Sequence, residues 1–333
     1  MSNGRARSPR TQPRGRAHTP RPSDLVALVT FDGEVYENQA VTRVRLARPT
    51  AAPHPLNAAI EQWLGGRRRT WIDVRGRQIN GIATARELSS SRAWVIDTLV
   101  DASTGPEQGV VAALLRQVIE AATQHRVTHV LFRTAAHGPA SDAALRAGFK
   151  PALSEQLWSG TLPVRDAPSP RQATVREIGD EDAFALFRLY NRAFPLEGRQ
   201  ALALTLDQWR DIQDRRWLGR GSREYVAADS TSGTNAADGA RAALRVAHAG
   251  ETGQFDLLAD AGGMDGAAAL LDVAAERLAA VSRVLALVPR CAAPLEQLLR
   301  ERGLHPEAEY TLLSRQTAKP VTARSRVAPE VAV

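Results

Sequence analysis

The chain of 333 residues has one cysteine, only two lysines and no long apolar run. The single cysteine, Cys291, excludes an internal disulfide framework and suits a reducing compartment, so we expect a cytoplasmic protein. No apolar stretch reaches the roughly 18 residues that cross a bilayer, so we expect no membrane partner. The Arg/Pro-rich N-terminus also lacks the apolar centre of a secretory signal.

Several catalytic signatures are missing as well. The sequence has no Cys-x-x-Cys pair, no Walker phosphate loop and no serine nucleophile elbow. His125 and His129 are four residues apart, but His129 begins an expected strand, so the two do not share one helical face. We therefore expect no metal site.

The net charge of +7 is concentrated at the two ends of the chain. Residues 1–22 hold six arginines and no acidic residue, and residues 315–333 hold four basic residues against one glutamate. The residues between them are slightly acidic in sum. We expect disordered basic arms over 1–23 and 316–333. Such arms bind polyanions without specificity, but solubilising tails are the simpler interpretation, so nucleic acid is not the expected partner.

The first half reads as a mixture of strands and helices. DLVALVTF and EVYENQAVTRVRLA flank Asp32-Gly33, which is typical of a β-hairpin. Hydrophobic periodicity and turn residues then predict a helix over 55–64, strands over 70–76, 77–88 and 92–102, a helix over 110–125, a strand over 128–134, a helix over 141–148 and a strand over 152–162.

The segment 163–171, PVRDAPSPR, is typical of an interdomain linker. A similar order follows it. We expect a strand over 173–179, helices over 180–194 and 204–218, a strand over 223–229, a polar loop over 229–240, a hairpin over 240–261, a helix over 264–281, a strand over 283–288, a helix over 293–302 and a strand over 308–315.

The two halves also match residue by residue. VIDTLVDA (95–102) aligns with QFDLLADA (254–261), which pairs Asp97 with Asp256 and Leu99 with Leu258. AGFKP (147–151) aligns with RGLHP (302–306) in the same way. The sequence therefore predicts two copies of one α+β unit, over 24–162 and 172–315.

The order of strand, glycine turn, long helix, strand, short helix ending in x-Gly-Phe and final strand resembles the GNAT superfamily of N-acetyltransferases. The resemblance covers roughly 40–162 and 172–315, and its clearest stretch is LLRQVIEAATQHRVTHVLFRTAAHGPASDAALRAGF (114–149). It implies two tandem domains of the α+β class, each a mixed, mostly antiparallel, splayed sheet flanked by helices. It also implies that acetyl-CoA binds where two central strands part.

In this family the turn after the fourth strand wraps the pyrophosphate, because a helix N-terminus offers unpaired N–H donors. In DASTGPEQGVVAALL (101–115) the motif positions fall on Pro106, Gly109 and Val111; Pro106 has no N–H, and Val111 is bulky. In the second copy they fall on Gly262, Asp265 and Ala267, and an acidic residue there repels phosphate. The first copy is thus the better candidate. The implied cofactor-binding residues are Leu99, Val100, Asp101, Gln108, Gly109, Val110, Val111 and Ala112.

The transfer needs a base for the amine and an acid for the leaving thiolate. Asp97 occupies a place from which many family members take the base, and Asp256 is its counterpart. Burial would raise the pKa of Asp97 and improve it as a base, whereas the alternative is a structural carboxylate bonded to an arginine or a backbone group. His137 is the candidate for the acid or for a contact with CoA. The general-acid tyrosine of the family is absent from both copies.

The leading interpretation is transfer of an acyl group from acetyl-CoA to an amine by direct attack, with a small-molecule or peptide acceptor. The first alternative is an inactive tandem protein that keeps the fold for binding or assembly. The second is a nucleic-acid-associated protein that uses its basic arms. The sequence leaves homo-oligomerisation open.

Overall fold

The computed structural model describes residues 17–32, 36–47, 55–103, 109–165, 173–214, 221–229, 239–290 and 293–317. Most of both basic arms, most of the linker and of the loop 229–240, Pro106, Gln108 and Cys291 lie outside these ranges. The predictions made for them stay predictions.

The first half starts with short helices and continues with strands and two longer helices. Its elements are η1 (Pro22–Asp24), α1 (Leu25–Thr30), α2 (Arg43–Ala47), α3 (Pro55–Trp63), β1 (Arg68–Arg75), β2 (Gln78–Glu87), β3 (Ala93–Asp101), α4 (Val110–Gln124), β4 (His129–Ala135), α5 (Pro139–Arg146) and β5 (Lys150–Gly160).

The second half places its extra helices before its second strand. Its elements are β6 (Ala173–Glu177), η3 (Asp180–Asp182), α6 (Ala183–Ala193), α7 (Leu196–Leu202), α8 (Leu206–Asp211), β7 (Arg223–Asp229), β8 (Ala240–Ala249), β9 (Thr252–Ala259), α9 (Met264–Arg277), β10 (Arg283–Pro289), α10 (Ala293–Glu301) and β11 (Leu304–Gln316). From β7 on, the order repeats that of β1 to β5.

The repeat is visible in the backbone at the ends of α5 and α10. Gly148 follows α5 with φ +84°, and Gly303 follows α10 with φ +85°. Only glycine adopts this left-handed conformation without a steric penalty, and it reverses the chain into the next strand. The matched glycines of the two copies therefore end the same helix and turn the chain in the same way.

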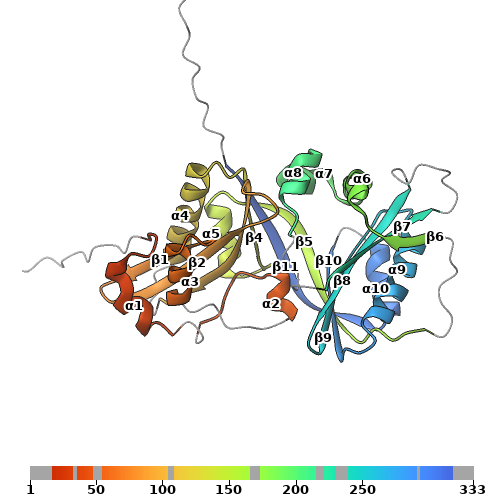
Figure 1. Ribbon diagram of the computed structural model, residues 1–333, viewed down its shortest axis with the longest axis horizontal. Helices are drawn as coiled ribbons and strands as arrows, with labels where there is room; N and C mark the ends of the chain where they lie inside the picture. Colours follow the sequence, from red (N-terminus) through yellow and green to blue (C-terminus); the bar gives the residue numbers. More distant parts are fainter. Residues whose placement is uncertain are drawn as a thin grey trace, which may run out of the picture.

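The eleven strands of the described residues form one sheet, in the order β1-β2-β3-β4-β11-β5-β10-β9-β8-β7-β6 (Figure 1). The pairs β3/β4 and β9/β10 are parallel, and the other neighbours are antiparallel. The predicted mixed, mostly antiparallel sheet flanked by helices is thus confirmed.

The two copies exchange their last strands at the centre of this sheet. β11, from the second half, pairs with β4 of the first half, and β5 pairs with β10 of the second half. β5 and β11 also pair with each other. The halves are therefore joined by continuous hydrogen bonding, which the repeat in the sequence does not reveal.

Helices pack on both faces of the sheet. α4 and α5 cover one face of the first half, where Trp94 is buried, and α1 and α3 cover the other. In the second half α9 and α10 cover the face that buries Phe255, and α6 covers the opposite face. α6, α7 and α8 lie above the central strands (Figure 1).

Two predictions for the N-terminal region are wrong. The expected hairpin around Asp32-Gly33 is absent from the described residues, because 25–30 form α1, which buries Ala27 and Leu28, and 43–47 form α2. A short apolar run fits either a strand or a buried helix, and here packing decided. Residues 17–23 are also not a free arm, since the backbone of His18 pairs with Ile72 of β1.

One buried side chain carries a prediction about stability. Gln254 on β9 is fully buried, and neither its amide oxygen nor its amide nitrogen has a hydrogen-bond partner among the described residues. An unsatisfied buried amide costs about 1–3 kcal/mol. We expect Gln254→Met to raise the free energy of unfolding in urea by about 1 kcal/mol.

Gln156 on β5 provides the matched control. Its side-chain amide is also buried, but it donates to the backbone oxygens of Ala308 (2.9 Å) and Leu157 (3.2 Å). Gln156→Met should therefore lower the free energy of unfolding by about 1 kcal/mol. A destabilising Gln254→Met would show that its amide is satisfied by water or another group.

Candidate functional site

The gap between β3 and β4 is filled by the chain itself. The two strands pair over four residues and then diverge. A segment just before α2 lies across the gap: Gln39 N donates to Leu99 O (2.8 Å) on β3, and Val41 N donates to Arg133 O (2.8 Å) on β4. The side-chain oxygen of Asn38 accepts from Leu99 N (2.8 Å). The edge of β3 in the first half is therefore already hydrogen-bonded.

The corresponding gap between β9 and β10 is different. Their pairing ends at Phe255 and Ala286. Arg283 N donates to Glu251 O, so every second residue of β9 directs its backbone groups toward β10. Leu257, two residues beyond the last pair, then presents its N–H and C=O to the gap. No described segment forms backbone hydrogen bonds in this gap as residues 38–41 do in the first half.

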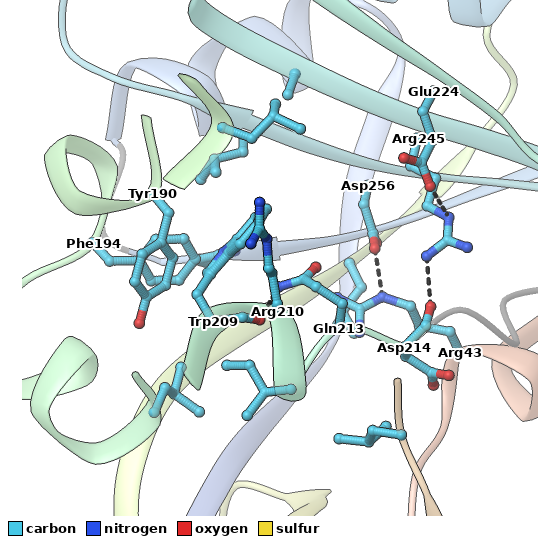
Figure 2. A pocket seen from close by; sticks show the side chains of 18 of the residues that line it. Arg43, Tyr190, Phe194, Trp209, Arg210, Gln213, Asp214, Glu224, Arg245 and Asp256 are labelled. Atoms are coloured by element: carbon cyan, nitrogen blue, oxygen red, sulfur yellow. Dashed lines mark hydrogen bonds and ion pairs between the residues drawn. The ribbon is translucent and has the colours of Figure 1, made fainter. Parts of the chain in front are cut away.

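A large cavity of about 970 Å³ lies on the face of the sheet beside this second gap. Its floor comes from strands of both halves, and α6, α8 and the residues after α8 form its other wall. Figure 2 shows aromatic side chains at one end and ion pairs at the other. The cavity is thus built where the two copies meet.

The aromatic end contains Tyr190 of α6, Phe194 directly after α6 and Trp209 of α8 (Figure 2). The rings of Tyr190 and Phe194 are 4.8 Å apart. Burial raises the pKa of the Tyr190 hydroxyl to about 12, and this hydroxyl donates to Ala203 O (3.2 Å). Tyr190 therefore lines the cavity with an uncharged side chain at neutral pH. Aliphatic side chains complete this end: Leu88, Val95, Leu131, Leu153, Leu202, Ile212 and Leu312.

Asp256 and Arg43 form the centre of the charged end. Arg43 Nε lies 2.6 Å from an Asp256 oxygen, and Arg43 NH2 lies 3.9 Å from Glu155. Burial opposes the charge of Arg43, but the two carboxylates outweigh it and hold the pKa of the guanidinium above its usual value. Arg43 begins α2, directly after the segment that fills the first gap, so that segment helps to position a side chain of the second site.

The other ion pairs of this end are also formed within the chain. Arg133 binds Glu155 through two contacts of 2.5 and 3.1 Å. Arg245 lies 3.0 Å from Glu224 and donates to the backbone oxygen of Asp214 (2.7 Å). Because these guanidiniums are engaged by carboxylates or a carbonyl, they are not free to bind an anionic ligand.

The predicted catalytic residues of the first half lie outside this cavity. Asp97 is buried, accepts two hydrogen bonds from Arg68 and accepts one from the Thr84 hydroxyl (2.5 Å). It thus occupies the structural position that the sequence left as the alternative. His137 is an exposed residue between β4 and α5. Neither Asp97 nor His137 is among the residues that line the cavity, whereas Asp256 is.

The predicted cofactor residues of the first half fall into two groups. Leu99 and Val100 are fully buried, Asp101 accepts from the backbone and hydroxyl of Ser103, and Gln108 lies outside the described residues. Gly109, Val110, Val111 and Ala112 form the start of α4, and both valine side chains are buried in the core. Of the described residues of this turn, 109–112 offer a phosphate their backbone N–H groups and no polar side chain.

The turn of the second half carries more positive charge. Asp260 is buried, ion-paired with Arg192 (2.6 Å) and Arg241 (3.4 Å), and accepts a hydrogen bond from Gly262 N (3.1 Å). Two guanidiniums thus meet one carboxylate beside the start of α9. α9 has no side-chain N-cap, so its first N–H groups remain open, and Asp265 is exposed in its first turn. Among the described residues, no arginine forms an ion pair with Asp101 of the first half.

The described residues contain neither a metal-binding cluster nor a membrane-spanning helix. Within the described ranges, no group of three or more His, Cys, Asp or Glu side chains is arranged to hold a metal ion. Among the helices that the structure describes, none is long and apolar enough to span a membrane.

Sequence reasoning found Asp256 but missed most of the cavity. Arg43 lies in a segment that the sequence predicts as a strand, and Tyr190, Trp209 and Arg210 lie on helices that carry no recognised motif. The nearest signal was the aromatic content of 187–194 and 209, which also fits an ordinary amphipathic helix. These residues meet only because the copies share one sheet.

Of the comparisons with known proteins, the one with solved structures shows the fold. No protein-family model matches the chain, and no curated protein matches it. A GCN5-related N-acetyltransferase from Sphaerobacter thermophilus is similar in structure, with a TM-score of 0.50 and 15% identity over 90% of this chain and 95% of that one. The chain therefore has the GNAT fold, as the sequence predicts.

Two other solved structures align over most of the chain. A tandem GNAT protein from the clavulanic acid biosynthesis pathway has a TM-score of 0.48 and 15% identity, over 89% of this chain and 93% of its own. A putative acetyltransferase from Pyrococcus horikoshii has a TM-score of 0.48 and 10% identity, over 96% of this chain and 94% of its own.

Proposed function

We propose that the protein is an acyl-CoA-dependent N-acyltransferase and that its cosubstrate, acetyl-CoA, binds in the second half. The gap between β9 and β10 carries this proposal, because it opens onto the large cavity while the gap of the first half is filled by the protein's own backbone. This choice differs from the sequence-based preference for the first copy.

The residues of the second half fit the parts of such a cosubstrate. The free N–H groups at the start of α9 suit a pyrophosphate, and Arg192 and Arg241 place two positive charges against the one carboxylate of Asp260 nearby. The backbone C=O of Leu257 suits an amide N–H of an extended arm, because it faces the gap. When bound, acetyl-CoA supplies an activated thioester.

The cavity provides the position of the acceptor amine. Asp256 lies on the cavity side of β9, where its carboxylate would attract an ammonium group and take one proton from it. As the C–N bond of the amide forms, the thioester C–S bond would break, and the departing sulfur would take the second proton of the amine. The N–H of Leu257 is placed to donate to the oxygen that gains negative charge during attack. The apolar end of the cavity holds the rest of the acceptor and keeps water away from the reacting atoms.

The experiment is calorimetric titration of acetyl-CoA into two matched variants. Gly262→Glu places a carboxylate at the start of α9, and Gly109→Glu places one at the start of α4. A Cβ at Gly262 meets no atom closer than 3.6 Å, and a Cβ at Gly109 meets none within 4 Å, so both variants should fold. We expect Gly262→Glu to weaken acetyl-CoA binding about tenfold or more through charge repulsion.

Gly109→Glu should change the affinity by less than about twofold, because screening by salt weakens charge effects at a distance. If Gly109→Glu weakened binding and Gly262→Glu did not, the cosubstrate site would lie in the first half, at Leu99, Gly109 and their neighbours. No binding of acetyl-CoA to the unmodified protein at millimolar concentration would favour a non-catalytic tandem protein instead.

A further inference from the structure

Arg210 differs from the other arginines that line the cavity. It lies on α8, and Figure 2 shows its guanidinium rising between the aromatic side chains and Asp256. Arg43, Arg133 and Arg245 are each engaged by a carboxylate within 3.0 Å, as described above. The side chain of Arg210 forms no hydrogen bond or ion pair with any described residue. It is therefore a cation available to a ligand.

Asp256 is the opposite charge that faces the same space. One of its oxygens pairs with Arg43, and the side chain is 26% exposed. An ionised carboxylate has about four acceptor positions, so one ion pair leaves capacity for an ammonium group. The other carboxylates of this end are each held by an arginine: Glu155 by Arg133, Glu224 by Arg245 and Asp214 by Arg86.

The space between these charges is bounded by apolar groups. Tyr190, Phe194 and Trp209 form a wall beside Arg210 (Figure 2). Aromatic side chains bury large areas and favour a flat or bulky apolar group. The aliphatic floor of the cavity belongs to strands of both halves. A ligand that contacts Arg210, Asp256 and the apolar wall together has a negative end, a positive end and an apolar body.

We propose that the acceptor is an amino acid with a large apolar side chain, whose carboxylate binds Arg210 and whose amine faces Asp256. Arginine forms strong, charge-assisted hydrogen bonds with carboxylates. This arrangement directs the amine toward β9, on the side where the second gap opens. The inference rests on the proposed function for the transfer step, but recognition of the amino acid does not require a bound acyl-CoA.

The test measures binding by calorimetry without any acyl-CoA. The probes are L-phenylalanine, phenethylamine (which lacks the carboxylate), 3-phenylpropanoate (which lacks the amine) and L-serine (which lacks the apolar group). We expect L-phenylalanine to bind best. Arg210→Met should weaken L-phenylalanine and 3-phenylpropanoate about tenfold or more, and phenethylamine by less than about twofold.

Asp256→Asn should weaken L-phenylalanine and phenethylamine but leave 3-phenylpropanoate unchanged. The control is Arg116→Met, an exposed arginine on α4 outside the cavity, which should change none of the affinities. Because Arg210 is exposed, its variant should fold normally, and its thermal unfolding checks this. Equal effects of Arg210→Met on L-phenylalanine and phenethylamine, or no binding of L-phenylalanine at 10 mM (about 2.7 kcal/mol of binding free energy), would overturn the proposal.

The outcomes separate this inference from the proposed function. Selective binding of L-phenylalanine without acetyl transfer would support the amino-acid site and contradict the proposed transferase activity. Acetyl transfer to amines with and without a carboxylate at similar rates would support the transferase activity and contradict the amino-acid site.

Discussion

Replacing Glu155 with glutamine is expected to lower the free energy of unfolding by about 3–5 kcal/mol, which is the usual cost of breaking a buried ion pair by removing one partner. Glu155 on β5 and Arg133 on β4 have side chains only 2% and 7% exposed, and their closest contact is 2.5 Å. The substitution keeps the size of the side chain but leaves Arg133 as a buried charge without a carboxylate. The measurement is urea unfolding followed by tryptophan fluorescence.

The same substitution at an exposed pair is the control. Glu309 of β11 contacts Arg290 at 2.7 Å, but both side chains are more than 40% exposed. Glu309→Gln should therefore cost less than about 1 kcal/mol. The double variant Arg133→Met/Glu155→Leu should recover most of the lost stability, because it removes both charges together. Similar losses at Glu155 and Glu309 would mean that water reaches the central pair.

Replacing Asn38 with alanine is expected to cost about 2 kcal/mol of unfolding free energy. Its side-chain oxygen accepts from the backbone N–H groups of Leu99 (2.8 Å) and Ala40 (2.9 Å), and its amide donates to Asp97 O (3.3 Å). Leu99 is fully buried, so its N–H would be left without an acceptor. Faster hydrogen exchange at Leu99 should accompany the loss.

Asn80→Ala is the matched control. The Asn80 side chain donates one long hydrogen bond, of 3.4 Å, to Asp73, so its loss should cost less than about 1 kcal/mol. The Asn38 variant should still bind one acetyl-CoA per chain, since the described part of the first turn has no arginine pair like that around Asp260. A second bound equivalent would instead identify the first gap as a covered cosubstrate site.

The secondary structure was predictable wherever the periodicity of apolar residues along a segment is clear. The periodic stretch 110–125 became α4, and the alternating segments around it became strands. The segment 24–47 was not predictable, because its short apolar runs fit both a strand and a helix. Contacts with distant partners decided it: α1 packs on α3, and residues 38–41 pair with Leu99 and Arg133.

The candidate site shows the same division. The pairing of Asp97 with Asp256 follows from the repeated letters, but the repeat cannot tell which copy keeps an open gap. Asp97 is bound by Arg68 and Thr84, whereas Asp256 reaches the cavity, and this difference arises from side chains far apart in sequence.

The sequence by itself determined the repeated α+β unit, the GNAT fold and the position of the two strand–turn–helix segments, because local periodicity and turn residues encode them. Only the tertiary structure decided that β5 and β11 change places, that residues 38–41 fill one gap, and that Arg43 and Arg210 face one cavity. The two final strands have similar hydrogen-bonding edges, so their choice of partner depends on the packing of the whole sheet.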